Sequence, residues 1–501
     1  MARGQTVSLQ SPVARTRPAA NAAYLIAANL LAKLFSLILV LYATRTLGRH
    51  LYGNYVEVAA FVGLFSFLTD LGLSTVAVRD VAQDRSLATR YVSNMLLLRL
   101  FFSALDIVLI VVLAQQFVAP SLRAAIYVYA LALIPLTVMG TLQLAFQFSE
   151  RQGYTAVLNV GTTVVRIILS LLVLYVGHHV LALMLVFTAV TTVSAGVTAW
   201  LVYTRFLPRR MELDFFWWPV LLKQAAPFAF LALLNYFYAR VDMQLLYGFS
   251  GCEHARGNEG CSVTGLYGLA YQALDVASAV LVTSTGTALL PAINRVAVES
   301  HEALTRVIRS SYTLLLSVGV LGALFGMFYA TDILRLLGDR GFSGAAPALA
   351  ILVWALPCYL VLNMLGAALI AVHRQRVLMV SFAVTLVFNV VFNVLLIPHY
   401  SYIASSVLTV ASEIINSIFI VVALRQMLGP LGIGATTIRV AAVAVITAAV
   451  LWVLRGYSIV VGVPIGGVVA FLGLRVLRVV GATEREALAR IPVVGRCAAL
   501  L

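Results

Sequence analysis

Four basic side chains interrupt long apolar stretches of the sequence. Lys33, Arg99, Arg166 and Arg240 each lie well inside a run of hydrophobic residues. An unpaired cation in such surroundings costs several kcal/mol, so these residues normally face water, a partner or an anion. A guanidinium also binds phosphate oxygens with two parallel hydrogen bonds and stays charged when partly buried. We therefore expect Arg99, Arg166 and Arg240, with Lys33 as a weaker candidate, to line one central cavity and bind a pyrophosphate or similar anionic group.

A structural role for the same cations is the competing interpretation. Polar residues recur at helical spacing in several apolar runs, as expected for interhelical hydrogen bonds and ion pairs. In this view Arg99 pairs with Asp106, two turns away, and Arg240 pairs with an acid on a neighbouring helix. Arg166 separates the two interpretations best, because its own polar stripe contains no acid.

Acidic residues inside the apolar runs are candidates for coupling transport to an ion gradient. Burial disfavours the charged form of a carboxyl group and a nearby arginine favours it, so a proton site needs the two effects balanced. Asp242 lies two residues from Arg240, and Asp275 shares a helical face with Tyr267 and Tyr271. We favour Asp242 and Asp275, with Asp70 as a further candidate; the alternative is that each is a static counter-ion. The acids considered are Asp70, Asp106, Asp242, Asp275 and Glu413.

Residues typical of enzymes and metal sites are scarce. No Ser-His-Asp arrangement or phosphate-binding glycine loop stands out, and the adjacent His178 and His179 cannot share a helical face as metal ligands. We predict no catalytic residue, metal or cofactor. Cys252 and Cys261 share the polar loop 251–262, which we place outside the cell, where they either form a disulfide or remain two free thiols.

The apolar runs themselves predict membrane-spanning helices. Of the 501 residues 62% are hydrophobic and only 11% are charged, too few charges for the surface of a soluble protein of this size. The runs have about the 20 residues that a helix needs to cross a bilayer. About fourteen spans are predicted, at 21–43, 54–78, 91–114, 122–148, 154–176, 179–204, 217–247, 262–290, 304–330, 344–371, 376–397, 402–424, 436–454 and 457–478.

The distribution of basic residues predicts the orientation. With the N-terminus in the cytoplasm, 23 of the 34 lysines and arginines fall on the inner side, seven on the outer side and four within spans. This bias follows the positive-inside rule and places both termini in the cytoplasm. The net charge of +15 is therefore explained by topology, and no nucleic-acid partner is predicted.

A short repeat suggests two related halves. Residues 51–55, with sequence LYGNY, open the second span, and residues 266–271, LYGLAY, open the eighth. An even number of spans separates them, so both copies point the same way across the membrane, as in two lobes related by an axis along the membrane normal. We expect an N-lobe at 21–210, a C-lobe at 211–430, two extra helices at 431–478, and cytoplasmic tails at 1–20, disordered, and 479–501.

Four motifs resemble those of a known family. The stretch 47–55, LGRHLYGNY, resembles the LG-x-x-x-YG-x-Y signature of polysaccharide and O-antigen flippases. The same family is matched by 70–73 (DLGL) with Arg79, by 265–271 (GLYGLAY), and by 389–398 (NVVFNVLLIP). The resemblance covers about residues 21–425. One departure is Ser401, where the family usually has glycine, which leaves the geometry of that turn open.

The resemblance implies a flippase that moves polyprenyl-pyrophosphate-linked oligosaccharides across the cell membrane by alternating access. The family belongs to a superfamily that also contains multidrug exporters and lipid II flippases. A multidrug exporter is one alternative, which the buried cations disfavour. A membrane glycosyltransferase or polymerase is another, which the short loops disfavour. Expected partners are the lipid-linked oligosaccharide, membrane lipid, and the polymerase and glycosyltransferases of the same polysaccharide.

Overall fold

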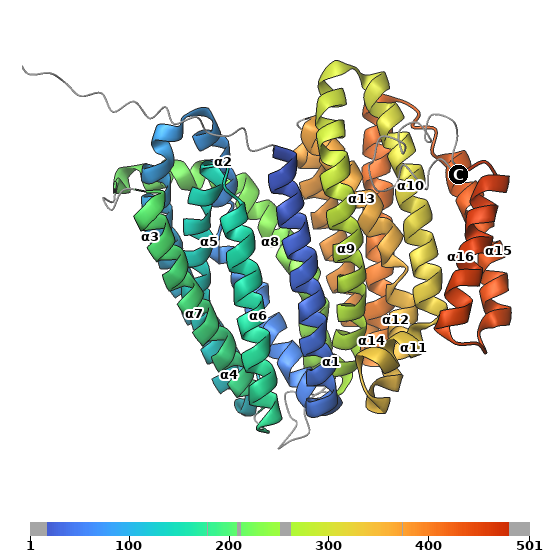
Figure 1. Cartoon of the computed structure of the whole chain (residues 1–501), viewed down its shortest axis with the longest axis horizontal. Helices are drawn as coiled ribbons and strands as arrows, with labels where there is room; N and C mark the ends of the chain where they lie inside the picture. Colours follow the sequence, from blue (N-terminus) through green and yellow to red (C-terminus); the bar gives the residue numbers. More distant parts are fainter. Residues whose placement is uncertain (1–17, 178, 208–211, 251–261, 373, 480–501) are drawn as a thin grey trace, which may run out of the picture.

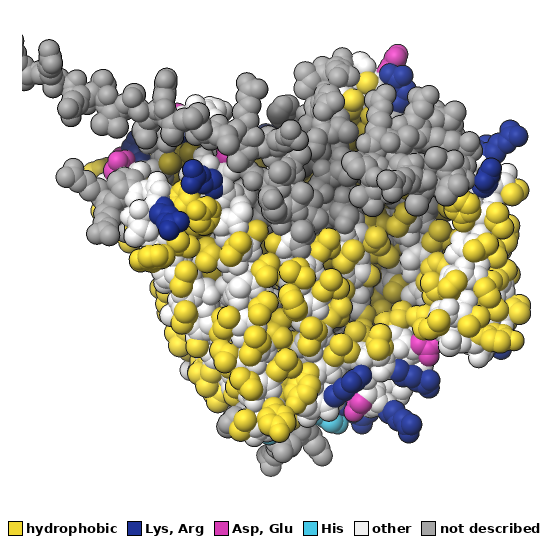
Figure 2. Space-filling model, viewed as in Figure 1, with side chains coloured by type: hydrophobic (Ala, Val, Ile, Leu, Met, Phe, Trp, Pro, Cys, Tyr) yellow, Lys and Arg dark blue, Asp and Glu magenta, His cyan; other side chains and the backbone are white. Residues whose placement is uncertain are grey.

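The molecule is a bundle of helices with an apolar exterior. The structure is a computed structural model, and it describes residues 18–177, 179–207, 212–250, 262–372 and 374–479. Helices fill almost all of these ranges, which contain no strand. Large apolar side chains point outward along the bundle, such as Val157, 73% exposed, and Ile438, 72% exposed. In Figure 2 these side chains cover the flanks, while the charged side chains drawn lie near the two ends, as expected for a protein embedded in lipid.

The first half of the chain forms the helices on one side of the bundle (Figure 1). Short 3-10 turns lie between some of the long helices, and the first helix is interrupted at Gly48. The elements are α1 (Pro18–Phe65), η1 (Ser66–Thr69), α2 (Leu73–Gln83), η2 (Arg85–Leu87), α3 (Ala88–Phe117), α4 (Pro120–Leu131), α5 (Leu133–Phe148), α6 (Gly153–Tyr175) and α7 (Val180–Arg205).

The second half continues across the bundle to the C-terminal helices at its far edge (Figure 1). Its elements are η3 (Phe215–Trp217), α8 (Trp218–Phe249), α9 (Ser262–Glu299), α10 (His301–Phe328), α11 (Ala330–Leu337), η5 (Arg340–Ala345), α12 (Ala346–Leu352), α13 (Ala355–Ala371), α14 (Gln375–Leu428), α15 (Gly434–Leu454) and α16 (Ile459–Val476).

The all-α membrane fold predicted from hydropathy is confirmed. In the described part of the chain eleven helices are long and apolar enough to span a membrane, or twelve if the bent pair of α12 and α13 counts as one. The helices α1 and α14 each contain one non-helical residue, Gly48 and Ser401, and so correspond to two predicted spans apiece. Every one of the fourteen predicted spans overlaps a helix or a closely spaced helix pair. The number of crossings, the lobe limits and the orientation stay predictions.

The predicted span 54–78 is not one continuous helix. Hydropathy gave an unbroken helix over 54–78, but the helix ends at Phe65, and a 3-10 turn precedes the restart at Leu73. Just before the restart, Leu71 and Gly72 both have positive φ, 48° and 71°, so no right-handed helix continues through them. The apolar residues on both sides of this break hide it from a hydropathy window, because hydropathy reports burial and not backbone conformation.

The two copies of the repeat lie against each other. A Cβ atom added to Gly265 would lie 2.2 Å from the carbonyl oxygen of Arg49 and 3.1 Å from the amide nitrogen of Gly53. A Cβ atom on Gly268 would lie 2.7 Å from Cγ1 of Val56. Only glycine allows the start of α9 to approach the second part of α1 so closely. The contact is the one expected if an axis along the membrane normal passes between the two copies.

The C-terminal helices pack at the edge of the bundle. The helices α15 and α16 contact each other and α10, and Figure 1 shows them farthest from α1. The sequence run that forms α16 contains Gly462, Pro464 and Gly466 but remains one helix. The two glycines bring α16 close to the side chains of Tyr329 and Phe325. These residues therefore serve close packing, and they do not interrupt the span.

Candidate functional site

A cavity of about 710 Å³ lies in the middle of the bundle. Residues of α1, α4, α6, α7, α8 and α9 line it, so both halves of the chain contribute to its wall. Its charged residues are Lys33, Arg166, Arg240 and Asp275. Three of the four predicted cations are thus brought together around one space, and they outnumber the single acid.

Arg166 and Arg240 carry the unpaired positive charge of this cavity. The Nε atom of Arg166 is buried and has no hydrogen-bond partner among the described residues, and its guanidinium lies 5.1 Å from the ring centroid of Phe187. The aromatic ring stabilises the cation without neutralising it. Arg240 is exposed to the cavity, beside Gly63 on α1, and forms no ion pair within the described chain. Both guanidinium groups therefore keep donors free for an anion.

Lys33 and Asp275 form an ion pair across the cavity wall. The Nζ atom of Lys33, on α1, donates to Oδ2 of Asp275, on α9, at 3.0 Å. The two side chains are 39% and 47% exposed, so water screens the attraction and the pair contributes at most about 1 kcal/mol. An anion that enters the cavity can compete with Asp275 for Lys33. The predicted coupling role of Asp275 is untested and stays a prediction.

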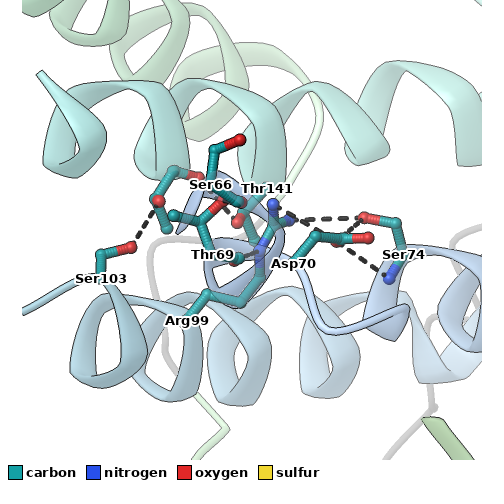
Figure 3. A network of polar contacts seen from close by, with 8 residues as sticks. Ser66, Thr69, Asp70, Ser74, Arg99, Ser103 and Thr141 are labelled. Atoms are coloured by element: carbon teal, nitrogen blue, oxygen red, sulfur yellow. Dashed lines mark hydrogen bonds and ion pairs between the residues drawn. The ribbon is translucent and has the colours of Figure 1, made fainter. Parts of the chain in front are cut away.

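Arg99 does not line this cavity. It is buried within the first half of the chain, where Nε donates to the carbonyl oxygen of Thr69 at 2.8 Å and Nη2 lies 3.3 Å from Oδ1 of Asp70 (Figure 3). The break after η1 leaves this carbonyl without a helical partner, and Arg99 satisfies it. The partner is thus Asp70 and not Asp106, which the sequence had suggested. Asp70 in turn accepts hydrogen bonds from the amide and hydroxyl of Ser74.

Asp242 is buried in a polar cluster behind the cavity. Its carboxyl accepts a 2.5 Å hydrogen bond from the hydroxyl of Tyr267 and one of 2.8 Å from the amide of Met243. One turn of α14 nearby carries Thr409 and Glu413, and Glu413 accepts from Tyr238 at 2.6 Å. Neither Asp242 nor Asp70 belongs to the lining of the cavity. Their coupling roles also stay predictions.

The asparagine motif holds the two parts of α14 together. Asn393 donates to the carbonyl oxygen of Asn389 and accepts from Ser405 at 3.0 Å, while Asn389 donates to Ser412 at 3.1 Å. The bonds with Ser405 and Ser412 cross between the parts of α14 before and after Ser401. Ser401 has φ 51° and ψ −139°, a backbone conformation that favours glycine, so the departure from the family pattern falls where glycine would fit best.

Sequence reasoning missed several residues of the site. Tyr55, Tyr129 and Tyr271 line the cavity. Their signal in the sequence is weak, because tyrosine is common in membrane helices. The predicted disulfide partners Cys252 and Cys261 lie outside the described residues.

The cavity is closed at the end of the bundle where α1 breaks at Gly48. There the hydroxyl of Thr44 donates to the carbonyl oxygen of Leu337 at 2.7 Å, and Tyr52 packs edge-on against Phe342 with ring centroids 5.7 Å apart. Towards the other end, where α1 begins, Lys33 and Asp275 remain partly exposed. Access to the cavity is therefore from the side of the N-terminus.

This fold and this cavity define a multi-pass membrane protein built like a transporter. The sequence profile described as "Polysaccharide biosynthesis protein" matches residues 19–297, more than half of the chain, and the chain belongs to this family. A second profile, that of the MatE family, matches residues 261–395. Among curated proteins, none matches the sequence significantly.

Solved structures show the same fold at low sequence identity. The lipid II flippase MurJ, in an inward closed conformation, is 11% identical with a TM-score of 0.72, covering 90% of this chain and 97% of that one. An inward-facing multidrug resistance MATE family transporter of the MOP superfamily is 15% identical, with a TM-score of 0.60 and coverages of 82% and 99%. A MOP superfamily transporter from Pyrococcus furiosus, described as having a binding pocket of reverse polarity, is 14% identical, with a TM-score of 0.56 and coverages of 83% and 97%. The chain thus has the fold of MOP superfamily membrane transporters.

Proposed function

We propose that the chain is a flippase that carries a polyprenyl-pyrophosphate-linked oligosaccharide across the cell membrane for the synthesis of a surface polysaccharide. The observation that carries the proposal is the excess of positive charge in the central cavity, where Arg166 and Arg240 form no ion pair with any of the described residues. A pyrophosphate is the part of such a substrate that matches these guanidinium groups. Membership of the polysaccharide biosynthesis protein family supports the sugar, and the fold supports alternating access.

The cavity also suits the sugar part of the substrate. Tyr55, Tyr129 and Tyr271 combine apolar ring faces with hydroxyl groups, which fits the mixed apolar and polar surface of a sugar ring. With the predicted orientation, both termini lie in the cytoplasm and the cavity is open to the side on which lipid-linked sugars are assembled. A polymerase and glycosyltransferases of the same polysaccharide are then the expected neighbours.

Export of drugs is the second candidate, favoured by the MatE profile over residues 261–395. A cationic drug would need unpaired acids in the cavity, whereas the acid there, Asp275, is paired with Lys33. The charge of the cavity therefore favours an anionic substrate.

Arg166→Gln tests the proposal. Loss of one charge-assisted contact of about 1.5–3 kcal/mol should weaken binding of undecaprenyl pyrophosphate to the purified protein roughly 10- to 150-fold. Undecaprenol, which lacks the pyrophosphate, should bind wild type and variant equally weakly. In cells that lack the native gene, the variant should fold but fail to restore export of the polymer.

Two matched substitutions complete the test. Arg455→Gln removes an exposed arginine that stacks on Trp452 outside the cavity, and it should leave binding unchanged. Arg99→Gln removes a buried arginine and strands Asp70, so it should lower the melting temperature. A folded Arg166→Gln variant with wild-type affinity and full polymer export would refute the proposed function of this cavity.

A further inference from the structure

Exposed arginines gather at one end of α10, α14 and α15. The link between α9 and α10 lies at the end of the bundle where α1 begins (Figure 1), and the two ends of α14 and the start of α15 lie there too. The described side chains of these three helices at this end include one acid, Glu302. Six exposed arginines, which we call the arginine surface, accompany it: Arg306, Arg309, Arg374, Arg376, Arg425 and Arg439.

One apolar cluster brings these arginines together. Each of four leucine or isoleucine residues in it lies within two positions of an arginine of the surface: Leu304 and Ile308 on α10, and Leu378 and Leu424 at the two ends of α14. Because these side chains pack in the same cluster, the arginines beside them lie around one patch at the end of the bundle.

Contacts of Arg309 and Arg439 add the start of α15 to this patch. A Cβ atom added to Gly432, in the loop between α14 and α15, would lie 3.1 Å from Nη1 of Arg309. The hydroxyl groups of Tyr312, one turn further along α10, and Thr437 on α15 are 2.9 Å apart. Nη1 of Arg439 donates to the carbonyl oxygen of Arg478 at 3.0 Å. The guanidinium groups thus lie over the junction of α10, α14 and α15.

None of these six arginines forms an ion pair with a described residue. The first half of the chain differs at the same end of the bundle, where three arginines each have an acidic partner. The pairs are Arg79 with Asp80 at 2.7 Å, Arg90 with Asp214 at 2.6 Å, and Arg85 with Glu150. The arginine surface is therefore a local excess of positive charge and not a general property of this end.

Membrane topology does not explain the scarcity of acids. The positive-inside rule depends on lysine and arginine, and aspartate and glutamate contribute little to it. The first half of the chain carries acids beside its arginines at the same end, as this rule permits. Like charges that gather without acids repel each other, unless another molecule supplies the negative charge.

The surroundings of the arginine surface favour a lipid as that molecule. Val422 lies one turn before Arg425, and Ile438 directly precedes Arg439; both are large, exposed apolar residues on the flank of the bundle. A ligand that contacts the arginines and these residues together carries an anionic group and acyl chains. Phosphate oxygens match the guanidinium groups, and clusters of basic residues at the ends of membrane helices attract anionic lipids.

We propose that the arginine surface binds the headgroup of an anionic phospholipid in the leaflet at this end of the bundle. Arg309, Arg425 and Arg439 contact the phosphate, which supplies the negative charge that the protein lacks between α10, α14 and α15. The acyl chains lie along Val422 and Ile438. This site is separate from the central cavity and does not depend on the substrate carried there.

Lipid binding to the purified, full-length protein tests the proposal. Native mass spectrometry counts the molecules of phosphatidylglycerol and of phosphatidylcholine, with identical acyl chains, that remain bound at each lipid concentration. The wild type should bind phosphatidylglycerol more tightly. Each arginine contributes about a fivefold factor, so the combined variant Arg309→Gln, Arg425→Gln and Arg439→Gln should bind phosphatidylglycerol about 100-fold more weakly. Its binding of phosphatidylcholine should not change.

Matched variants separate charge from folding. Arg85→Gln removes an exposed arginine at the same end but outside the arginine surface, and it should bind phosphatidylglycerol as the wild type does. Replacing the same three arginines by lysine keeps the charge and should restore much of the affinity. If the triple glutamine variant does not fold, Arg425→Gln alone should still show the fivefold loss.

The proposal is overturned if wild type binds the two lipids equally, or if the glutamine variants bind phosphatidylglycerol as tightly as wild type. Soluble glycerol phosphate that binds as tightly as phosphatidylglycerol would show a site for small phosphates and no lipid site. Tighter binding of a glutamate-rich peptide would indicate a protein contact instead. Arg166→Gln should leave phosphatidylglycerol binding unchanged, and a 100-fold loss there would place this lipid in the central cavity.

Discussion

Replacing Gly265 by alanine should force the closed end of the cavity open. The added Cβ would lie 2.2 Å from the carbonyl oxygen of Arg49, where ordinary contact begins at 3.4 Å. Both atoms belong to or adjoin the backbone, so neither can rotate away, and α9 and α1 must separate by roughly 1 Å. Overpacking of this kind costs about 1–3 kcal/mol, and the cost falls only on the closed state. The ratio of open to closed protein should therefore rise about 5- to 150-fold.

The shift is measured in protein whose four native cysteines are replaced by serine. The rate at which a hydrophilic maleimide labels Leu337→Cys, at the closed end, is divided by the rate for the exposed reference Leu336→Cys, and this labelling ratio rises as that end opens. Gly161→Ala is the matched control, because a Cβ at Gly161 on α6 meets nothing within 4 Å. The control should keep the wild-type labelling ratio and gain slightly in stability, since alanine favours helix over glycine. The reasoning is refuted if Gly265→Ala folds with the same melting temperature and the same labelling ratio as Gly161→Ala.

Two further substitutions address single residues. Ser401→Gly should raise the melting temperature by about 1–2 °C, since glycine adopts the positive φ at 401 without strain, and a fall would show that the serine side chain is needed there. Asp275→Asn should tighten binding of undecaprenyl pyrophosphate at almost no cost in stability, because it frees Lys33 from a partly exposed ion pair; weaker binding, measured by titration of the purified protein, would exclude Lys33 as a ligand.

The sequence predicted the helices well because hydropathy and helix length depend on the membrane alone. Long apolar runs must form helices in lipid, whatever their neighbours, so the helices of the bundle were visible without tertiary information. The break between Phe65 and Leu73 was not visible, because Leu71 and Leu73 continue the apolar pattern through it. Backbone conformation at one or two residues leaves little trace in a hydropathy profile.

Charges inside the spans were easy to find, but their partners were not. Arg166 and Arg240 line one cavity, and their binding of the substrate stays a prediction. Arg99 has the same chemistry and a similar polar stripe, and it instead satisfies the carbonyl oxygen of Thr69 and pairs with Asp70. That carbonyl is free only because the second predicted span breaks there. An error in backbone continuity thus became an error in the assignment of a side chain, since tertiary partners depend on where helices end.

The cavity that holds Arg166 and Arg240 is sealed at one end and accessible at the other. Its volume of about 710 Å³ is in the range of pockets that enclose a small ligand, so a long oligosaccharide cannot lie wholly within it. Under the proposed function, sugars beyond the first few extend through the accessible end into water, where they add no contact and no steric penalty. Glycans that share the same pyrophosphate and proximal sugars but differ in chain length therefore present one ligand to this protein. A cell could lengthen or vary the distal sugars of its polysaccharide without any change in these cavity residues.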